Sequence, residues 1–371
     1  MNKSYYCLGL MSETSGDGVD ASVIKSDGEN KFNEISNFYR KYDQKTKSEI
    51  HSLQEEIRNK KNKKIPTKQI LVELSLRLKD LSEKITNFHI DFSKSIISKT
   101  EVNLIGFHGQ TILHYPEEKI SVQLGEGELL SKKTERPVVY NFRENDIKNG
   151  GEGAPLTPIY HNCLKNKFNL RRNTLFLNIG GIANCSFIDD VSIFAKDVGP
   201  GNCLMDMYIN KTKQLDFDDG GKIASSGNVD KVLINNLLDH DDYNSIDKHS
   251  LDVKDFDINF VKGLSTEDAL ANLNFLTSKI ISENIIKNFK GDFIIILCGG
   301  GRKNKTLISN LKFFLKNDIY NIDEFGIDGD FVESQAFAYL GIRSIYKKNI
   351  SFPNTTKVNT PSTGGELIKS N

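Results

Sequence analysis

The sequence predicts an α/β protein with two lobes, and three observations lead to that fold class. The chain has 371 residues, more than a single hydrophobic core usually serves. A strand, a glycine-containing turn and a returning strand follow one another at residues 5–24 and again at residues 174–187. A third apolar strand, at 293–298, precedes three glycines and a helix. This recurrence suggests a duplicated architecture with one such glycine turn in each lobe.

The composition limits the possible partners. Hydrophobic residues make up 38% of the chain and charged residues 26%, which is typical of a globular protein in water. Lys+Arg and Asp+Glu both total 49, so no global field attracts nucleic acid or an anionic membrane. The composition therefore predicts neither nucleic acid nor a membrane as a partner. Any anion must therefore be bound by a local group of residues rather than by the overall charge.

The location is predicted to be cytoplasmic. No apolar run approaches the ~18 residues of a membrane span. Ser12, Glu13 and Asp17 interrupt the N-terminal apolar run too early for a signal peptide. The cysteines are scattered without a CxxC pair, which favours reduced, mostly buried thiols over disulfides or zinc. They are Cys7, Cys163, Cys185, Cys203 and Cys298.

A carboxylate beside a glycine bend is the central candidate for chemistry. Asp197 ends an apolar run and is followed by the turn Gly199-Pro200-Gly201-Asn202. We therefore expect Asp197 at the carboxyl end of a strand, where ligand crevices form in open α/β sheets. The alternative interpretation is an aspartate that caps the next helix or turn.

The N-terminal part predicts a phosphate-binding turn and two helices. Residues 5–11 and 19–24 read as strands, and the turn at 12–18 between them is rich in small hydroxyl residues and glycine. Such a turn can offer backbone N–H groups to a phosphate. Residues 45–64 and 67–98 read as helices, the second with an apolar stripe that indicates a core or partner contact.

Two further segments suggest a sugar site. Residues 103–107 read as a strand that delivers His108-Gly109-Gln110-Thr111 into a loop. His108 either hydrogen-bonds backbone or, with its amide and hydroxyl neighbours, binds sugar hydroxyls. After a short strand at 137–140 come Arg143 and Asp146, which either pair with each other or leave Arg143 to bind a carboxylate or phosphate. The glycine-rich loop at 150–155 allows backbone to pass close to a ligand.

A third glycine segment lies near the C-terminus. The apolar strand 293–298 is of the kind buried on both faces, and Gly299 to Asn304 lead into a helix at 305–315. This arrangement indicates nucleotide binding, although its spacing matches neither a P-loop nor GxGxxG. Residues 326–330 precede a further helix with Glu333 in its first turn. Glu333 is either a helix N-terminal charge or a ligand.

These motifs together resemble the anhydro-N-acetylmuramic acid kinase family. The resemblance runs from about residue 6 to 365, and only the charged region 40–70 has no counterpart motif. The motifs occur in the family's order: MSETSGDGVD, FHGQTILHYP, NFRENDIKNGGEGAPLTP, LNIGGIAN, DVGPGNCLMD, LCGGGRKN and DGDFVESQAFAYL.

The resemblance implies a two-lobed actin-like ATPase (ribonuclease H-like) fold around a central nucleotide and substrate cleft. Residues 1–145 with 352–371 would form lobe I, and 146–351 lobe II. It also implies the reaction: ATP-dependent hydrolytic opening of 1,6-anhydro-N-acetylmuramic acid with phosphorylation of O6, in cell-wall recycling. ATP and Mg²⁺ are the implied cofactors, and a homodimer is the implied assembly.

The resemblance also assigns roles to residues. Asp197 would be the general base that deprotonates the water attacking C1, and Glu333 would share that proton handling. Mg²⁺ would bind mainly to the ATP phosphates, with Asp17 or Asp20 reaching it through water. The implied substrate-binding residues are His108, Gln110, Arg143, Asp146, Gly201 and Asn202. The implied ATP-binding residues are Ser12, Glu13, Thr14, Ser15, Gly16, Asp17, Gly18, Val19, Asp20, Gly180, Gly181, Gly299, Gly300, Gly301 and Asn304.

Four positions depart from the family pattern. Glu13 stands where the family has glycine, and a carboxylate ~5 Å from a phosphate charge costs roughly 3 kcal/mol at an effective dielectric near 20. Glutamate also tolerates poorly a backbone conformation that requires glycine. Val198 replaces a threonine, Gly16 a larger apolar residue and Asn141 a commonly acidic one.

Two alternatives therefore stay open beside the active kinase. The first is a catalytically impaired homologue that binds nucleotide or muropeptide sugar as a sensor or scaffold, which Glu13 and Val198 favour. The second is a kinase of the same fold for another sugar, because fold alone does not fix the substrate.

Overall fold

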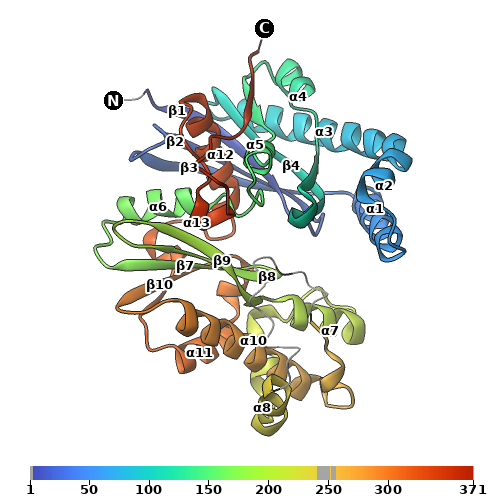
Figure 1. Cartoon of the computed structure of the whole chain (residues 1–371), viewed down its shortest axis with the longest axis vertical. Helices are drawn as coiled ribbons and strands as arrows, with labels where there is room; N and C mark the ends of the chain where they lie inside the picture. The colour runs from blue at the N-terminus through green and yellow to red at the C-terminus, as the bar shows by residue number, and fades with distance from the viewer. Residues whose placement is uncertain (1–2, 240–250, 252–255, 371) are drawn as a thin grey trace. The chain divides into compact units, whose positions relative to one another are not determined.

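The computed structural model describes residues 3–239, 251 and 256–370, and it divides into two compact units (Figure 1). Unit 1 comprises residues 1–167 with 333–371, and unit 2 comprises residues 168–332. The sequence-based division at 145/146 and 351/352 differs from this one. The reason is helix α6 (Pro158–Lys167), whose Tyr160 packs edge-on against Phe32 and donates a hydrogen bond to Gln335, both in unit 1.

The sheet of unit 1 has the strand order β12-β6-β4-β1-β2-β3, with β5 pairing β4 off this path. Strands β1, β2 and β3 form an antiparallel meander, and β4 returns parallel to β1. The strands are β1 (Tyr5–Ser12), β2 (Gly18–Ser26), β3 (Phe32–Lys41), β4 (Leu104–Tyr115), β5 (Ile120–Leu124), β6 (Val138–Tyr140) and β12 (Glu366–Ile368).

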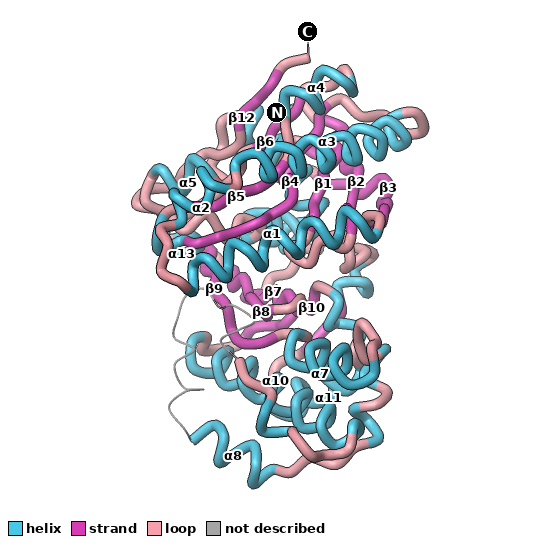
Figure 2. Tube along the Cα trace, turned by 90° about the vertical axis from the view of Figure 1, so that its right-hand side faces the viewer, coloured by secondary structure: helices cyan, strands magenta, loops and turns pink. Residues whose placement is uncertain are grey.

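The helices of unit 1 cover this sheet, and Figure 2 shows α1 lengthwise. The predicted helix at 67–98 is interrupted at Leu74, whose ψ of 6° is not helical. Its apolar stripe packs into the core of unit 1. The helices are α1 (Gln44–Asn62), α2 (Thr67–Glu73), α3 (Ser75–Ile97), α4 (Gly127–Thr134), α5 (Glu144–Lys148), α6, α12 (Val332–Ile345), which begins one residue before the unit, and α13 (Pro353–Thr356).

Unit 2 repeats the same topology. Its sheet has the order β11-β10-β7-β8-β9, in which β7, β8 and β9 form an antiparallel meander and β10 returns parallel to β7. The strands are β7 (Asn173–Ile179), β8 (Ile182–Ile188), β9 (Ile193–Pro200), β10 (Phe293–Cys298) and β11 (Ile319–Asn321). The repeat confirms the predicted duplication and the predicted α/β fold of the actin-like ATPase (ribonuclease H-like) class.

The helices of unit 2 centre on α10, which is buried along most of its length, including the polar residues Asn272 and Asn274. It packs against β9, α7 and α11. The helices are α7 (Cys203–Lys213), α8 (Lys231–Asp239), α10 (Thr266–Asn288) and α11 (Lys305–Phe314); the 3₁₀ turn η6 (Gly300–Lys303) follows β10, and η7 (Ile322–Phe325) follows β11.

Two strands run further than the sequence predicted. Strand β4 does not end at residue 107 but continues through His108 to Tyr115, because residues 110–115 pair with β5. Strand β9 likewise continues past Asp197 to Pro200, because residues 193–200 pair with β8. Both ladders shift register at the functional segments. Such bulges redirect side chains without ending the strand.

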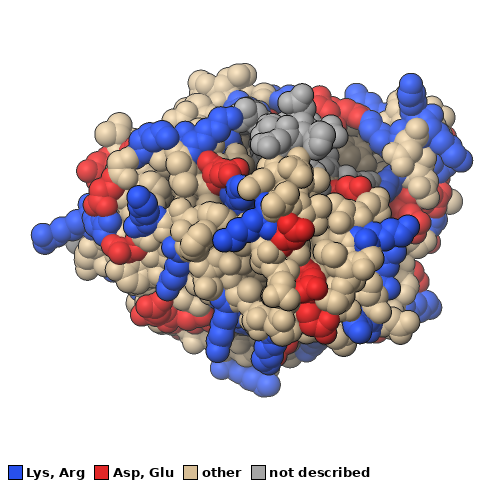
Figure 3. Space-filling view, turned by 90° about the horizontal axis from the view of Figure 1, so that it is seen from below, with Lys and Arg blue, Asp and Glu red and all other residues tan. Residues whose placement is uncertain are grey.

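The cysteines and the surface agree with the composition. All five cysteines are free and buried, as predicted. Within the described residues, every helix is too short or too polar to cross a lipid bilayer. On the face drawn in Figure 3, basic and acidic side chains are interspersed.

Candidate active site

The turn between β1 and β2 begins with a buried serine. The Ser12 hydroxyl is fully buried and lies 3.1 Å from the Tyr42 hydroxyl and 3.3 Å from His89 Nε2. His89 in turn donates from Nδ1 to the carbonyl of Ile85 at 2.8 Å. The Ser12 side chain is therefore committed to the core, and only its backbone remains for the predicted role in ATP binding.

Glu13 is exposed at the tip of this turn. Its backbone is not among those with a positive φ, so the predicted conformational cost of replacing glycine here is wrong. Its carbonyl accepts hydrogen bonds from the Gly16 N–H at 3.0 Å and from Gln110 Nε2 at 2.7 Å. The electrostatic repulsion between the Glu13 carboxylate and a phosphate does not depend on this backbone conformation.

The turn carries a negative field. Tyr39 lies beside it and donates to the Asp17 carbonyl at 3.3 Å. Burial raises the pKa of the Tyr39 hydroxyl, and the charges of Asp17, Asp20 and Glu13 raise it further. Burial tends to raise the pKa of Asp17, but hydrogen bonds from Lys47 and Ser15 outweigh it and lower the pKa overall. Asp17 forms an ion pair with Lys47.

His108 and Arg143 form one hydrogen-bonded cluster in unit 1. His108 donates from Nδ1 to the Gly109 carbonyl at 2.8 Å, so its Nε2 is the acceptor. Arg143 donates to that Nε2 from Nε at 3.2 Å and from Nη2 at 3.0 Å, and from Nη1 to the Gly153 carbonyl at 3.0 Å. Burial and the charge of Arg143 hold the pKa of His108 well below its usual range. The imidazole is therefore neutral.

Arg143 keeps donor capacity for an anion. Three of its five N–H groups point at His108 and Gly153, and the guanidinium plane is fixed by them. Burial lowers the Arg143 pKa to about 10, against the opposing charges of Glu333 and Asp146. A cationic group this desolvated is suited to a carboxylate.

Asp146 is a positioning residue for the glycine loop. It is 1% exposed, and its Oδ2 accepts from the Gly153 N–H at 2.6 Å while Oδ1 accepts from the Thr356 hydroxyl at 2.6 Å. A side chain at Gly151 would collide with this carboxylate. The predicted sugar contact would therefore have to come through the loop that Asp146 holds.

Helix α12 brings Glu333 and Phe337 into the same region of unit 1. Phe337 lies one turn after Glu333, and its ring packs against the His108 ring with 4.4 Å between centroids. The charge of Glu333 acts on Arg143. Unit 1 thus brings together His108, Arg143 and Glu333 of the predicted set.

Gln110 connects this region to the β1–β2 turn. Its side chain is fully buried in β4, and its Nε2 donates to the Glu13 carbonyl. Its Oε1 is buried without a hydrogen-bond partner within the described part of the chain. A buried orphan acceptor is costly unless a donor from outside satisfies it, so Gln110 remains available to a hydroxyl.

Asp197 lies in β9, opposite Asn184 of β8, two residues before Gly199. Its side chain is half-buried, and its Oδ2 accepts from the Leu251 N–H at 2.8 Å. The next residue, Val198, points to the other side of the strand and is fully buried in the core of unit 2. The carboxylate is thus held on a rigid strand.

Three glycine segments of unit 2 converge around Ile179 and Gly180. A Cβ at Gly201 would lie 2.1 Å from the Gly180 carbonyl oxygen, and one at Gly301 would lie 2.3 Å from Ile179 Cγ2. The Asn202 N–H donates to the Gly180 carbonyl at 2.8 Å. The predicted residues of the segments 180–181, 199–202 and 299–301 are therefore one cluster at the end of β7.

Asn304 uses its side chain to cap a helix. Its Oδ1 accepts from the Leu307 N–H at 3.0 Å at the start of α11, and the side chain is 8% exposed. An N-cap of this kind satisfies an orphan donor. The Oδ1 atom is therefore committed to the helix cap, whereas Nδ2 has, among the described residues, only a 3.9 Å contact with Met205 Sδ.

Arg302, which sequence reasoning did not select, holds the third glycine segment in place. Its side chain is 2% exposed and bonds Asp323 through Nε at 3.0 Å and Nη2 at 3.1 Å, and Asp330 through Nη1 at 2.5 Å. Nη1 also donates to the Gly299 carbonyl at 3.1 Å. The segment 299–304 is thus fixed to the segment 323–330, which leads to Glu333.

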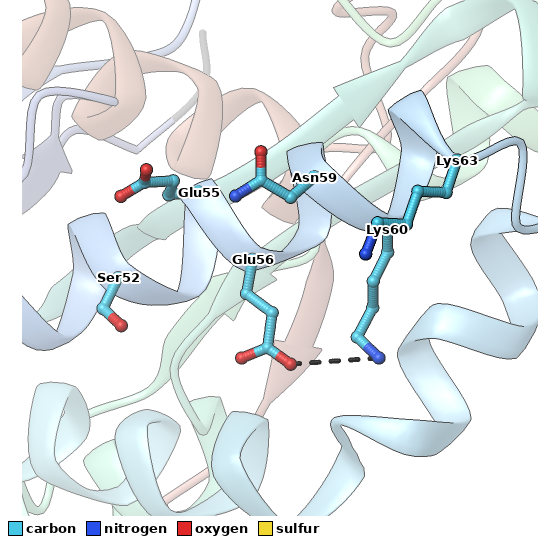
Figure 4. Close-up of a pocket in the computed structure, with 6 residues that line it drawn as sticks. All are labelled: Ser52, Glu55, Glu56, Asn59, Lys60 and Lys63. Atoms are coloured by element: carbon cyan, nitrogen blue, oxygen red, sulfur yellow. Dashed lines mark ion pairs between the residues drawn. The ribbon is translucent and has the colours of Figure 1, made fainter.

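Metal ligands are few at these sites. Among the described residues, no group of three or more His, Cys, Asp or Glu side chains could hold a metal ion. A surface hollow of 390 Å³ lies along α1 (Figure 4). As far as the chain is described, the hollow is lined by α1 and its C-cap Lys63 and includes the ion pair Glu56–Lys60 at 3.9 Å, so it is not part of the predicted site.

Comparison with known proteins establishes the family. The family model for anhydro-N-acetylmuramic acid kinase matches residues 5–369. The chain belongs to the anhydro-N-acetylmuramic acid kinase family. The kinase of that name from Pelagibacter ubique is 46% identical over the full length of both chains, and the one from Zymomonas mobilis is 36% identical, covering 97% of this chain and 98% of its own. This chain is accordingly an enzyme of the kinase class, and neither alternative hypothesis is favoured.

Solved structures resemble it more distantly. A glucokinase from Streptomyces griseus with glucose and AMPPNP is 11% identical, with a TM-score of 0.39 over 91% of this chain and 99% of its own. The activator of a dehydratase from Clostridium difficile with ADPNP is 10% identical, with a TM-score of 0.43 over 92% of this chain and 96% of its own. Likenesses this distant do not bear on substrate or mechanism.

Proposed function

We propose that this protein opens 1,6-anhydro-N-acetylmuramic acid with water and phosphorylates O6 with ATP, giving N-acetylmuramic acid 6-phosphate and ADP. The observation that carries the proposal is the half-buried Asp197, held on β9 two residues before Gly199 of the unit 2 glycine cluster, in a chain that matches the kinase family over residues 5–369. The other predicted site residues carry groups suited to proton transfer, sugar binding and ATP binding.

Asp197 acts as the general base in this proposal. Water attacks C1 of the sugar and loses a proton to the carboxylate, the C1–O6 bond breaks, and O6 attacks the γ-phosphorus as the bond to ADP breaks. A positioned base contributes typically ~10²–10⁴ in rate. Glu333 assists the proton handling from α12.

The sugar is held by unit 1 residues with fixed geometry. Arg143 pairs with the lactyl carboxylate through the donors that His108 and Gly153 leave unused. The buried Oε1 of Gln110 accepts a hydrogen bond from a sugar hydroxyl. Asp146 maintains the loop at 150–155.

ATP is bound by backbone N–H groups of the β1–β2 turn and by the glycine segments of unit 2. The carboxylates of Glu13, Asp17 and Asp20 repel phosphate, so a cation is needed there. Mg²⁺ prefers oxygen ligands and keeps several waters. Asp17, which pairs with Lys47, or Asp20 would reach it through water.

The test is an assay of purified protein with Mg-ATP and the anhydro sugar, following ADP and sugar phosphate. The proposal predicts ADP release that requires the anhydro sugar, with equimolar 6-phosphate product. N-acetylglucosamine in place of the anhydro sugar is the control. Turnover only with other sugars, or nucleotide binding without turnover, would contradict the proposal.

A further inference from the structure

One face of α1 contacts the β1–β2 turn residue by residue. The residues involved are Lys47, Ile50, His51 and Gln54, whose spacing of three and four places them on one side of the helix. This region, 40–70, matched no motif in the sequence. Figure 2 shows α1 running lengthwise in unit 1.

Two of these side chains bind backbone carbonyls of the turn. Gln54 Nε2 donates to the Thr14 carbonyl at 3.0 Å and to the Thr111 carbonyl at 3.3 Å. His51 donates from Nε2 to the Ser15 carbonyl at 2.6 Å. The helix thereby also links the turn to β4.

The other two side chains contact the next two residues of the turn. Ile50 lies against Gly16, where a Cβ would come within 3.0 Å of Ile50 Cγ2. Lys47 pairs with the Asp17 carboxylate. Moving toward the N-terminus of α1, the contacts therefore fall on four successive residues of the turn.

These contacts orient the peptide groups of the turn. In a planar trans peptide the C=O and N–H point in opposite directions. The Glu13 carbonyl is bound by Gln110 and the Thr14 carbonyl by Gln54. The N–H groups of Thr14 and Ser15 therefore point away from those two side chains.

We propose that α1 is the positioning element of the phosphate-binding turn, with Gln54 and His51 as positioning residues that act through the backbone. The inference rests on the proposed function, in which this turn binds ATP. Neither residue is required to touch the nucleotide. Gln54 holds the Thr14 carbonyl, so that the Ser15 N–H of the same peptide is presented to phosphate. His51 holds the Ser15 carbonyl, whose peptide N–H, on Gly16, donates to the Glu13 carbonyl, so His51 fixes the shape of the turn.

The helix itself is anchored independently of these contacts. Leu53 and Ile57 are buried in the core of unit 1. Glu49 pairs with Lys84 of α3 at 2.6 Å. Removing one polar contact to the turn should therefore leave the helix in place.

The test compares Gln54→Ala and His51→Ala with the matched control Asn59→Ala. Asn59 is an exposed residue of the same helix, on the hollow in Figure 4. Each positioning variant is expected to raise the KM and the Kd for ATP about fivefold, the usual effect of one lost hydrogen bond. The kcat, the KM for sugar and the melting temperature should change little. His51→Gln restores a donor and should recover most of the ATP affinity.

An unchanged Kd for ATP in both variants, or an equal rise in Asn59→Ala, would overturn the inference. Loss of kcat and melting temperature without a rise in KM would also overturn it, because that indicates only a structural role. Failure of the proposed function would appear differently, as a wild-type protein without sugar-dependent ADP release. Calorimetric ATP binding would still decide the role of α1.

Discussion

At the scale of single residues, the alternation of β9 separates chemistry from packing. Asp197 is half-buried on one side of the strand, and Val198 is fully buried on the other, among Leu177, Ile281 and their neighbours. A threonine at 198 would place its hydroxyl in that apolar core. The departure from the family pattern at Val198 is therefore a packing change rather than a lost ligand.

This leads to a prediction for Val198→Thr. The variant should lose about 1–3 kcal/mol of unfolding free energy, because a hydroxyl is buried without an assured partner. Its kcat should not rise above that of the wild type. Urea unfolding and steady-state kinetics measure the two quantities, and a clear gain in kcat would contradict the placement of Val198.

Glu13 is the second residue with a testable cost. Glu13→Gly should lower the KM for ATP severalfold, because a carboxylate beside the phosphates is removed and no backbone strain is relieved. The effect should shrink at high salt, since the side chain is exposed. Glu13→Gln is the control for the charge alone. A KM that does not fall in either variant would show that the repulsion is already screened.

At the scale of elements, the sequence indicated most strands and helices but not where two of them end. The apolar run and the glycine bend located β9, yet its pairing with β8 extends it to Pro200. Strand β4 runs on through His108 because β5 pairs with it. Residue types predicted the site, whereas pairing with the neighbouring strand in sequence sets where β4 and β9 end. The three- and four-residue spacing of Lys47, His51 and Gln54 places them on one helix face, but only the structure shows that this face contacts the β1–β2 turn.

The link between the 299–304 and 323–330 segments is also an element-scale feature. Arg302→Met removes a buried guanidinium and leaves three partly exposed carboxylates, of Asp323, Asp328 and Asp330, to solvent. The expected result is a loss of about 2 kcal/mol of stability and a higher KM for ATP. Lys303→Met is the matched control, since Lys303 also pairs with Asp330 but is exposed. Equal effects from both variants would contradict the role of Arg302.

At the scale of the whole molecule, the two units should respond oppositely to pH. The five histidines of the described chain lie in unit 1, and burial lowers the pKa of His89 to about 4 and those of His114 and His161 to about 3. In unit 2, burial and the charge of Asp216 raise the pKa of Asp206 to about 7. Unfolding thus takes up protons in unit 1 and releases one from unit 2.

The two units therefore differ in how their stability depends on pH. The histidines stabilise unit 1 fully above pH 6.5, and that stability is lost as the pH falls toward 4, by about 1–2 kcal/mol per histidine between pH 7 and 5. Asp206 has a raised pKa, so its contribution is present below pH 3.8 and is lost as the pH rises through 7. Hydrogen exchange, corrected for intrinsic rates, should therefore show unit 1 losing protection relative to unit 2 from pH 7.5 to 5. Parallel changes of protection in both units would contradict this prediction. So would a pH dependence of unit 2 protection that stays the same in the variant Asp206→Asn.

The central claim concerns the origin of the new oxygen in the product. In water labelled with ¹⁸O, wild-type protein with ATP and the anhydro sugar should give a 6-phosphate product with one ¹⁸O at C1 and none in the phosphate. Asp197→Asn should still bind ATP but form this product ~10²–10⁴ more slowly. Label in inorganic phosphate, or full activity in Asp197→Asn, would contradict the account.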